Sequence, residues 1–151
     1  MLIDSLGRKI EYLRVSVTDR CNLRCIYCMP DTPVIPKPKN EILSFEELEK
    51  IIEIFAALVI KKIKITGGEP LVRKGLVGFI RKIASINGLD DISLTTNGIL
   101  LEEYARDLKN AGLKRINISL DTLHSDKFVK IARGYNLAQV LAGIDEVNKL
   151  N

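Results

Sequence analysis

Hydrophobic and polar residues follow two periods that alternate along the chain. Runs with strand character, rich in β-branched and apolar residues, occupy residues 12–18, 62–66, 91–96 and 115–120. After each run, apolar residues recur every three or four positions, which predicts helices. Strands that alternate with helices predict an α/β fold with a parallel sheet and right-handed crossovers.

The helical stretches have recognisable beginnings. They span residues 43–58, 75–87, 101–113, 125–133 and 136–150. Ser44 and Glu47 have the spacing of a capping box, and Ser125 and Asn136 are expected to cap the last two helices. Residues 30–40 hold four of the five prolines, so they predict an extended connection.

Four short motifs each follow a predicted strand: CNLRCIYC, GGEP, TTNG and DTLH. In parallel α/β folds, ligands bind at the carboxyl ends of the strands. We therefore expect the four motifs to meet at one site. Four strands cannot close a barrel, and the fourth strand is expected to leave an open edge.

Composition and charge indicate which kinds of partner and location to expect for this protein. The chain has 151 residues, of which 46% are hydrophobic and 28% charged, as in a single soluble domain. Its net charge of +4 comes from scattered cations, so no nucleic-acid partner is expected. Without a signal peptide or a long apolar run, no membrane association and a cytoplasmic location are expected, where thiols stay reduced.

The only cysteines, Cys21, Cys25 and Cys28, have the spacing CxxxCxxC. Thiolates favour zinc, copper(I) and iron–sulfur clusters. Three ligands on a [4Fe–4S] cluster would leave one iron free to coordinate a small molecule. The alternatives are a zinc site completed by His124, a redox pair of Cys25 and Cys28, and inert buried thiols.

CxxxCxxC after the first strand and GGEP after the second resemble the radical S-adenosylmethionine (SAM) superfamily. Within it, YLRVSVTDRCNLRCIYCMP, ITGGEPLVRKGL, LTTNGILL and AGLKRINISLDTL closely resemble the GTP 3′,8-cyclase family of molybdenum cofactor biosynthesis. The resemblance implies that the chain is the N-terminal part of a partial, TIM-like parallel β/α barrel. Residues 1–151 then form an incomplete radical SAM core domain of four βα units.

The resemblance also implies the cofactors and their ligands. Cys21, Cys25 and Cys28 hold a [4Fe–4S] cluster, whose fourth iron chelates SAM. Tyr27, Gly68 and Ser119 match the family's SAM contacts. An electron from the cluster cleaves SAM into methionine and an adenosyl radical, and Glu69 is expected to assist with the methionine ammonium.

GTP is the substrate that the resemblance implies. Arg14, Lys64 and Thr95 match the family's nucleotide contacts. Lys64 stands where family members often carry arginine. The positive charge is kept, but the planar guanidinium group, which can donate two parallel hydrogen bonds, is lost. The adenosyl radical takes hydrogen from ribose C3′, and the resulting carbon radical attacks guanine C8, which makes the family lyases. The resemblance assigns no catalytic side chain.

The chain also departs from the family pattern. It has no cysteine after Cys28, whereas the family carries a second three-cysteine cluster near its C-terminus. We therefore expect this chain alone to be inactive, and to need an electron donor and a second chain or dimer partner that completes the barrel. The alternatives are another radical SAM enzyme such as a peptide-modifying maturase, a non-catalytic truncated relative, or a zinc-binding domain.

Overall fold

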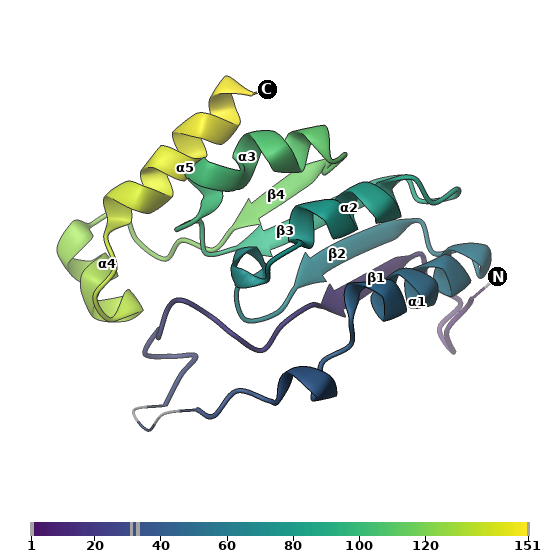
Figure 1. Cartoon of the computed structure of the whole chain (residues 1–151), viewed down its shortest axis with the longest axis horizontal. Coiled ribbons are helices and arrows are strands. Elements are labelled where there is room, and N and C mark those ends of the chain that lie inside the picture. Colours follow the sequence, from purple (N-terminus) through teal and green to yellow (C-terminus); the bar gives the residue numbers. More distant parts are fainter. Residues whose placement is uncertain (1, 31, 33, 151) are drawn as a thin grey trace.

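The fold is built on one parallel four-stranded sheet. A computed structural model describes residues 2–30, 32 and 34–150. The strands are β1 (Tyr12–Ser16), β2 (Lys62–Thr66), β3 (Asp91–Thr96) and β4 (Arg115–Ile118). They lie in the order β1-β2-β3-β4, and their arrows all point the same way in Figure 1. This order has no reversal point, so the sheet is wound as in a barrel and not as in a doubly wound sheet.

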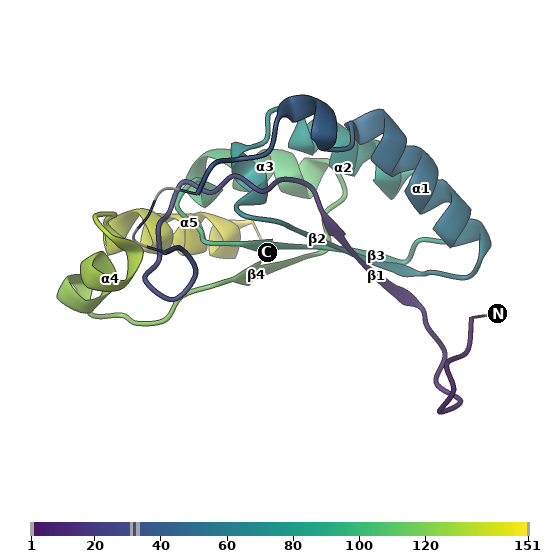
Figure 2. The ribbon, with the colours of Figure 1, turned by 90° about the horizontal axis from the view of Figure 1, so that it is seen from below.

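The helices cover one face of the sheet. They are α1 (Phe45–Ala57), α2 (Leu76–Ala84), α3 (Leu101–Asn110), α4 (Ser125–Ala132) and α5 (Leu137–Lys149), with short 3₁₀ turns η1 (Lys39–Glu41) and η2 (Pro70–Val72). Figure 2 shows α1, α2 and α3 on one side of the strands, and no helix of the described chain on the other. The predicted α/β class and partial-barrel architecture are therefore confirmed.

The predicted elements are all present, with small changes at their ends. β2 and β3 match their predicted bounds, whereas β1 and β4 each end two residues before their predicted ends. The Ser119 N–H still donates to the Thr96 carbonyl (2.9 Å), and the chain then turns from the sheet toward α4. The predicted connection at 30–40 is extended apart from η1; its residues 31 and 33 lie outside the described part.

Two of the three predicted helix caps are confirmed. Ser44 and Glu47 form a reciprocal capping box, and the Asn136 side chain accepts from the Ala138 N–H at 2.9 Å. The prediction for Ser125 was wrong, because Ser125 lies inside α4 and His124 holds the cap position without a side-chain bond. The reason is that the Phe128 N–H donates to the His124 carbonyl, which starts the helix one residue earlier.

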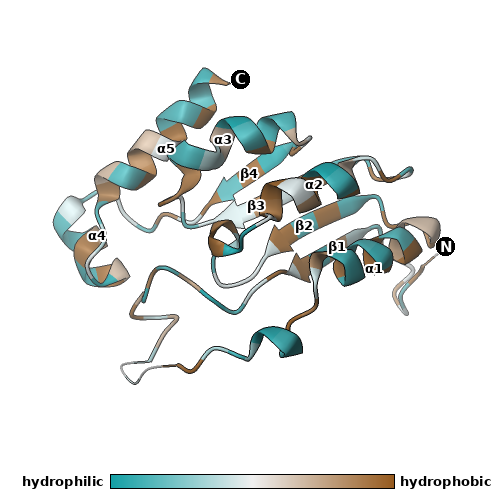
Figure 3. Ribbon diagram, in the orientation of Figure 1, coloured by the Kyte–Doolittle hydropathy of each residue, from teal (hydrophilic) through white to brown (hydrophobic). Residues whose placement is uncertain are grey.

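The core lies between the sheet and the helices. Val15, Ile65, Leu94 and Ile116 share one register row, and the parallel row beside it holds Leu13, Ile63 and Ile92. Strand residues of these rows pack against α1, α2 and α3, which carry apolar stripes (Figure 3). Four apolar residues of α2 are buried: Leu76, Phe79, Ile80 and Ile83.

The open edge predicted for the fourth strand is present. Among the described strands, β4 pairs only with β3. A groove of about 390 Å³ runs beside it, lined by residues 113–118 of this region and by Val147 and Leu150 at the end of α5. Within the described residues, no helix combines the length and apolar character needed to span a bilayer.

Two isoleucines of α1 give a matched test of the core. Ile52 is fully buried, and Ile54 is 62% exposed on the same helix. We expect Ile52→Ala to lower the free energy of unfolding by about 2–5 kcal/mol, because it leaves a cavity among close-packed side chains. Ile54→Ala is expected to change it by less than about 0.5 kcal/mol. Urea unfolding of both variants measures the difference; equal effects would contradict this packing.

Candidate functional site

The loops that follow the four strands are joined by hydrogen bonds at one edge of the sheet. The Gly68 N–H donates to the Thr18 carbonyl at 2.7 Å, which joins the loops after β1 and β2. The Asn97 N–H donates to Glu69 Oε2 at 2.7 Å, which joins those after β2 and β3. The Tyr27 hydroxyl donates to Asp121 Oδ2 at 2.8 Å, which joins those after β1 and β4. The predicted convergence of the four motifs is confirmed.

An apolar residue anchors the cysteine loop. Leu23, between the first two cysteines, is only 5% exposed. It packs in a small second core with Ile99, Phe128, Ala132, Leu137 and Val140, and Cys21 and Cys25 lie against this core. The Ile26 N–H also donates to the Ile131 carbonyl of α4 at 3.0 Å. The cysteine loop is therefore held in place by contacts with α4 and α5.

The three thiols are free and differ in burial. Cys21 and Cys25 are half-buried, and Cys28 is exposed. Burial raises the pKa of the Cys21 thiol and of the Cys25 thiol above the ordinary value for cysteine. Two donors reach Cys21 Sγ: the Leu23 N–H at 3.4 Å and the Asn97 side-chain amide at 3.8 Å. Both would stabilise negative charge on this sulfur.

The donor chemistry of this loop fits an iron–sulfur cluster. It offers three soft thiols, amide donors to one sulfur and an apolar floor, which are features of cluster sites. Among the described residues, no three His, Cys, Asp or Glu side chains are placed to hold one metal ion. In a four-iron cluster each thiolate binds a different iron, so the ligands surround the cluster and do not converge on one point.

The diglycine after β2 lets two loops touch through their backbones. Gly67 has a φ of +146°, and a Cβ there would lie 2.5 Å from the Thr18 carbonyl oxygen. A Cβ on Gly68 would lie 2.4 Å from the carbonyl oxygen of Arg20. Only residues without a side chain fit this approach. The exposed Gly68 thus lies directly beside the start of the cysteine loop.

Glu69 is buried and connects the loops after β2 and β3 through hydrogen bonds. Its side chain is 1% exposed, and it accepts from the Leu71 N–H (3.0 Å), the Thr96 hydroxyl (2.8 Å) and the Asn97 N–H (2.7 Å). Burial raises the pKa of the Glu69 carboxyl despite these donors. The carboxylate expected to assist with a methionine ammonium is thus occupied by groups of the chain itself.

Tyr27 closes the cysteine loop against the end of β4. Its ring is 67% exposed, and its hydroxyl bonds to Asp121, which lies beyond the end of the strand. This hydrogen bond is the main reason why the pKa of Tyr27 is raised well above the usual value for tyrosine. Ser119, predicted as a SAM contact, is exposed two residues before Asp121.

The sheet face without helices carries polar residues in register rows. One row holds Arg14, Lys64, Ser93 and Arg115, and the next holds Thr95 opposite Asn117. Arg14, Lys64 and Thr95, the predicted nucleotide contacts, therefore share this face. The Thr95 hydroxyl is buried, with no hydrogen-bond partner among the described residues. A buried hydroxyl without a partner is costly, so this hydroxyl is available to bond a ligand.

Sequence reasoning missed some residues of this region. Arg115 and Ser93 stand in the row of Arg14 and Lys64, although Arg115 is paired with Asp91. The alternation of period two could have placed both residues on this face. Asn97 lies in the TTNG motif, and no local pattern shows that its side chain reaches Cys21.

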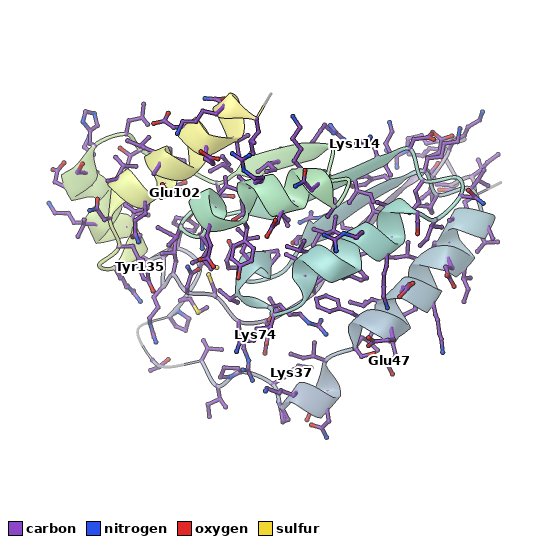
Figure 4. All side chains as sticks on the ribbon, turned by 45° about the horizontal axis from the view of Figure 1, so that its top comes forward. Lys37, Glu47, Lys74, Glu102, Lys114 and Tyr135 are labelled. Atoms are coloured by element: carbon purple, nitrogen blue, oxygen red, sulfur yellow. The ribbon has the colours of Figure 1, made fainter. Side chains whose placement is uncertain are left out.

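A separate cavity of about 370 Å³ lies beside the loop after β1. The described residues that line it include four cations, Arg20, Lys39, Arg73 and Lys74, and no acid. Arg73 is held by the carbonyls of Val17 and Leu43 and lies over the Phe45 ring. Lys74 and Lys37 lie on the same side of the molecule (Figure 4). The cavity lining beside the loop after β1 is therefore cationic.

Comparison with known families and relatives agrees with this geometry. The family model described as the radical SAM superfamily matches residues 15–151. GTP 3′,8-cyclases from Peptoclostridium acidaminophilum, Geobacter sulfurreducens and Campylobacter jejuni are 55%, 57% and 54% identical over 99%, 95% and 100% of this chain. The chain spans only 46%, 44% and 47% of those proteins, about half of their length.

Solved structures share the fold at low sequence identity. HydG, a maturase of the [FeFe]-hydrogenase, aligns with 91% of this chain at a TM-score of 0.70 and 18% identity. BtrN, solved with AdoMet and 2-DOIA, aligns with 89% at a TM-score of 0.58 and 18% identity. The chain covers 32% of HydG and 55% of BtrN, so the likeness concerns the fold of one part of each.

The backbone contact at Gly68 can be tested with a second glycine as control. We expect Gly68→Ala to destabilise the fold by about 1–3 kcal/mol, because the new methyl group would overlap the Arg20 carbonyl. At Gly78, inside α2, a Cβ meets nothing within 4 Å, so Gly78→Ala should be stabilising by about 0.5–1 kcal/mol. Thermal unfolding of both variants provides the measurement. A neutral Gly68→Ala would mean that the two loops do not touch.

Proposed function

The chain belongs to the radical SAM superfamily, and from this membership we propose that it forms the cluster-binding and SAM-binding part of a GTP 3′,8-cyclase of molybdenum cofactor biosynthesis. The observation that carries the proposal is the loop of three free thiols beside an open, polar sheet face. The identity of 54–57% to named GTP 3′,8-cyclases supports the choice of substrate.

Cys21, Cys25 and Cys28 are proposed to hold the [4Fe–4S] cluster. Leu23 and the second core fix the loop, and the Leu23 N–H and the Asn97 amide donate to one sulfur. When bound, the cluster supplies the single electron that cleaves SAM. The exposed thiol of Cys28 makes the loop accessible to an external electron donor, which the proposal requires as a partner.

Three positions around the cysteine loop are proposed to hold SAM. The Tyr27 backbone lies between two cysteines, Gly68 touches the start of their loop, and Ser119 lies at the exposed end of β4. These groups surround the same edge of the sheet from three sides. Their role would be to orient the cofactor against the sheet face, next to the proposed substrate site.

The open sheet face is proposed to take the GTP phosphates and ribose. Arg14 and Lys64 are register neighbours, so their cationic groups reach the same part of the face. The Thr95 hydroxyl, which has no hydrogen-bond partner in the described part of the chain, lies one row nearer to the cysteine loop and can bond to a nucleotide oxygen. None of these three groups distinguishes one base from another, so recognition of guanine must come from other parts of the complete enzyme.

Metal analysis of anaerobically reconstituted protein tests the cluster. We expect about four irons and about four inorganic sulfides per chain. Each of Cys21→Ala, Cys25→Ala and Cys28→Ala should lose most of the iron, because each removes one of only three protein ligands. The measurements are iron and sulfide content and the visible charge-transfer absorption.

His124→Ala is the matched control for the zinc alternative. His124 is exposed at the start of α4, and the cluster proposal gives it no role, so this variant should keep its iron. One tightly bound zinc per chain, lost on substitution of His124, would contradict the proposal and establish a Cys₃His site.

Phosphate binding tests the sheet face. We expect Arg14→Ala to weaken binding of GTP, ATP and inorganic triphosphate alike, by roughly tenfold to a hundredfold, since a charge-assisted hydrogen bond is lost. Arg8→Ala, which removes an exposed arginine paired with Asp4, serves as the control and should change nothing. Calorimetric titration of the three ligands measures the affinities. Equal affinities for the parent chain and Arg14→Ala would remove Arg14 from the site.

A further inference from the structure

The side-chain amide of Asn97 lies between the turn after β3 and the first cysteine. Asn97 Nδ2 donates to Asn22 Oδ1 at 2.8 Å and lies 3.8 Å from Cys21 Sγ. Asn97 and Cys21 are 76 residues apart in sequence, so this contact exists only in the folded chain. The described residues offer Cys21 Sγ one other donor, the Leu23 N–H at 3.4 Å within the loop itself.

The orientation of this amide is fixed by its other partners. Asn97 Oδ1 accepts from the Ile99 N–H at 3.0 Å, so the oxygen faces the turn and the NH₂ group faces the cysteine loop. The Asn97 main chain is held in turn by the buried Glu69 carboxylate, which also accepts from the Thr96 hydroxyl. A donor held from two sides is presented to the sulfur at little entropic cost.

An N–H donor at a cluster thiolate acts on the electron affinity of the cluster. Hydrogen bonds to the sulfurs stabilise the more negative, reduced state, and are among the means by which proteins set cluster potentials. Resting on the cluster proposed above, we propose that Asn97 is a positioning residue that orients Cys21 and raises the reduction potential of the cluster through its side-chain amide.

A purely structural role for Asn97 makes a different prediction. The turn requires only the side-chain oxygen, which accepts from the Ile99 N–H, and an aspartate supplies the same oxygen. Asn97→Asp therefore keeps the turn but replaces the amide that donates to Asn22 and Cys21 with a negatively charged acceptor. The two roles of the residue are separated by this one substitution.

The test is a redox titration of the reconstituted chain, followed by electron paramagnetic resonance. We expect Asn97→Asp to make reduction less favourable by about tenfold or more, which is about 59 mV for one electron. Asn97→Leu removes the donor without adding charge. It should lower the equilibrium constant for reduction of the cluster by about threefold to tenfold. Asn148→Asp makes the same chemical change on the exposed side of α5 and should leave the potential unaltered.

The outcomes separate this inference from the proposed function. If the parent chain assembles no cluster, the proposed function fails and this inference fails with it. If all variants load iron and have the reduction potential of the parent chain, the proposed cluster site is supported and the proposed role of Asn97 is refuted. Iron lost from Asn97→Asp but kept by Asn148→Asp, at unchanged melting temperature, supports the orientation of Cys21 by this amide, as does the expected shift in potential.

Discussion

The candidate site depends on one buried carboxylate that must find its partners inside the protein. Glu69 is almost completely removed from solvent, and a buried charge without hydrogen bonds would be strongly destabilising. Its partners come from η2 and from the end of β3, so satisfying it fixes the GGEP loop against the TTNG turn. The turn then carries Asn97, and Asn97 reaches the cysteine loop.

The two faces of the sheet carry different kinds of side chains. One face is apolar and packs against α1, α2 and α3, which supplies the stability of the domain. The other carries Arg14, Lys64, Ser93 and Arg115 in one row, and the next row holds the Thr95 hydroxyl, which is buried and has no hydrogen-bond partner among the described residues. In the wall of a barrel, the face of a sheet that lies opposite the helices turns toward the interior.

The cysteine loop combines a rigid base with accessible sulfurs. Leu23 and the backbone bond from Ile26 attach it to α4 and α5, while Cys28 remains exposed. The short second core is therefore as much a part of the site as the thiols, since it decides where they lie relative to the sheet. A loop of the same spacing without this apolar anchor would present the same ligands at no defined place.

The strands, the helices, the capping box at Ser44 and the grouping of four motifs at one edge of the sheet could all be predicted from the sequence. They follow from short-range periodicity and from the parallel topology. Cap selection at Ser125 failed because neighbouring residues competed for the same turn. The burial of Glu69, the register that aligns Arg115 with Arg14 on their common face, and the contact of Asn97 with Cys21 arise only when the chain folds. They join residues distant in sequence, and no local pattern encodes which of them will meet once the strands are aligned.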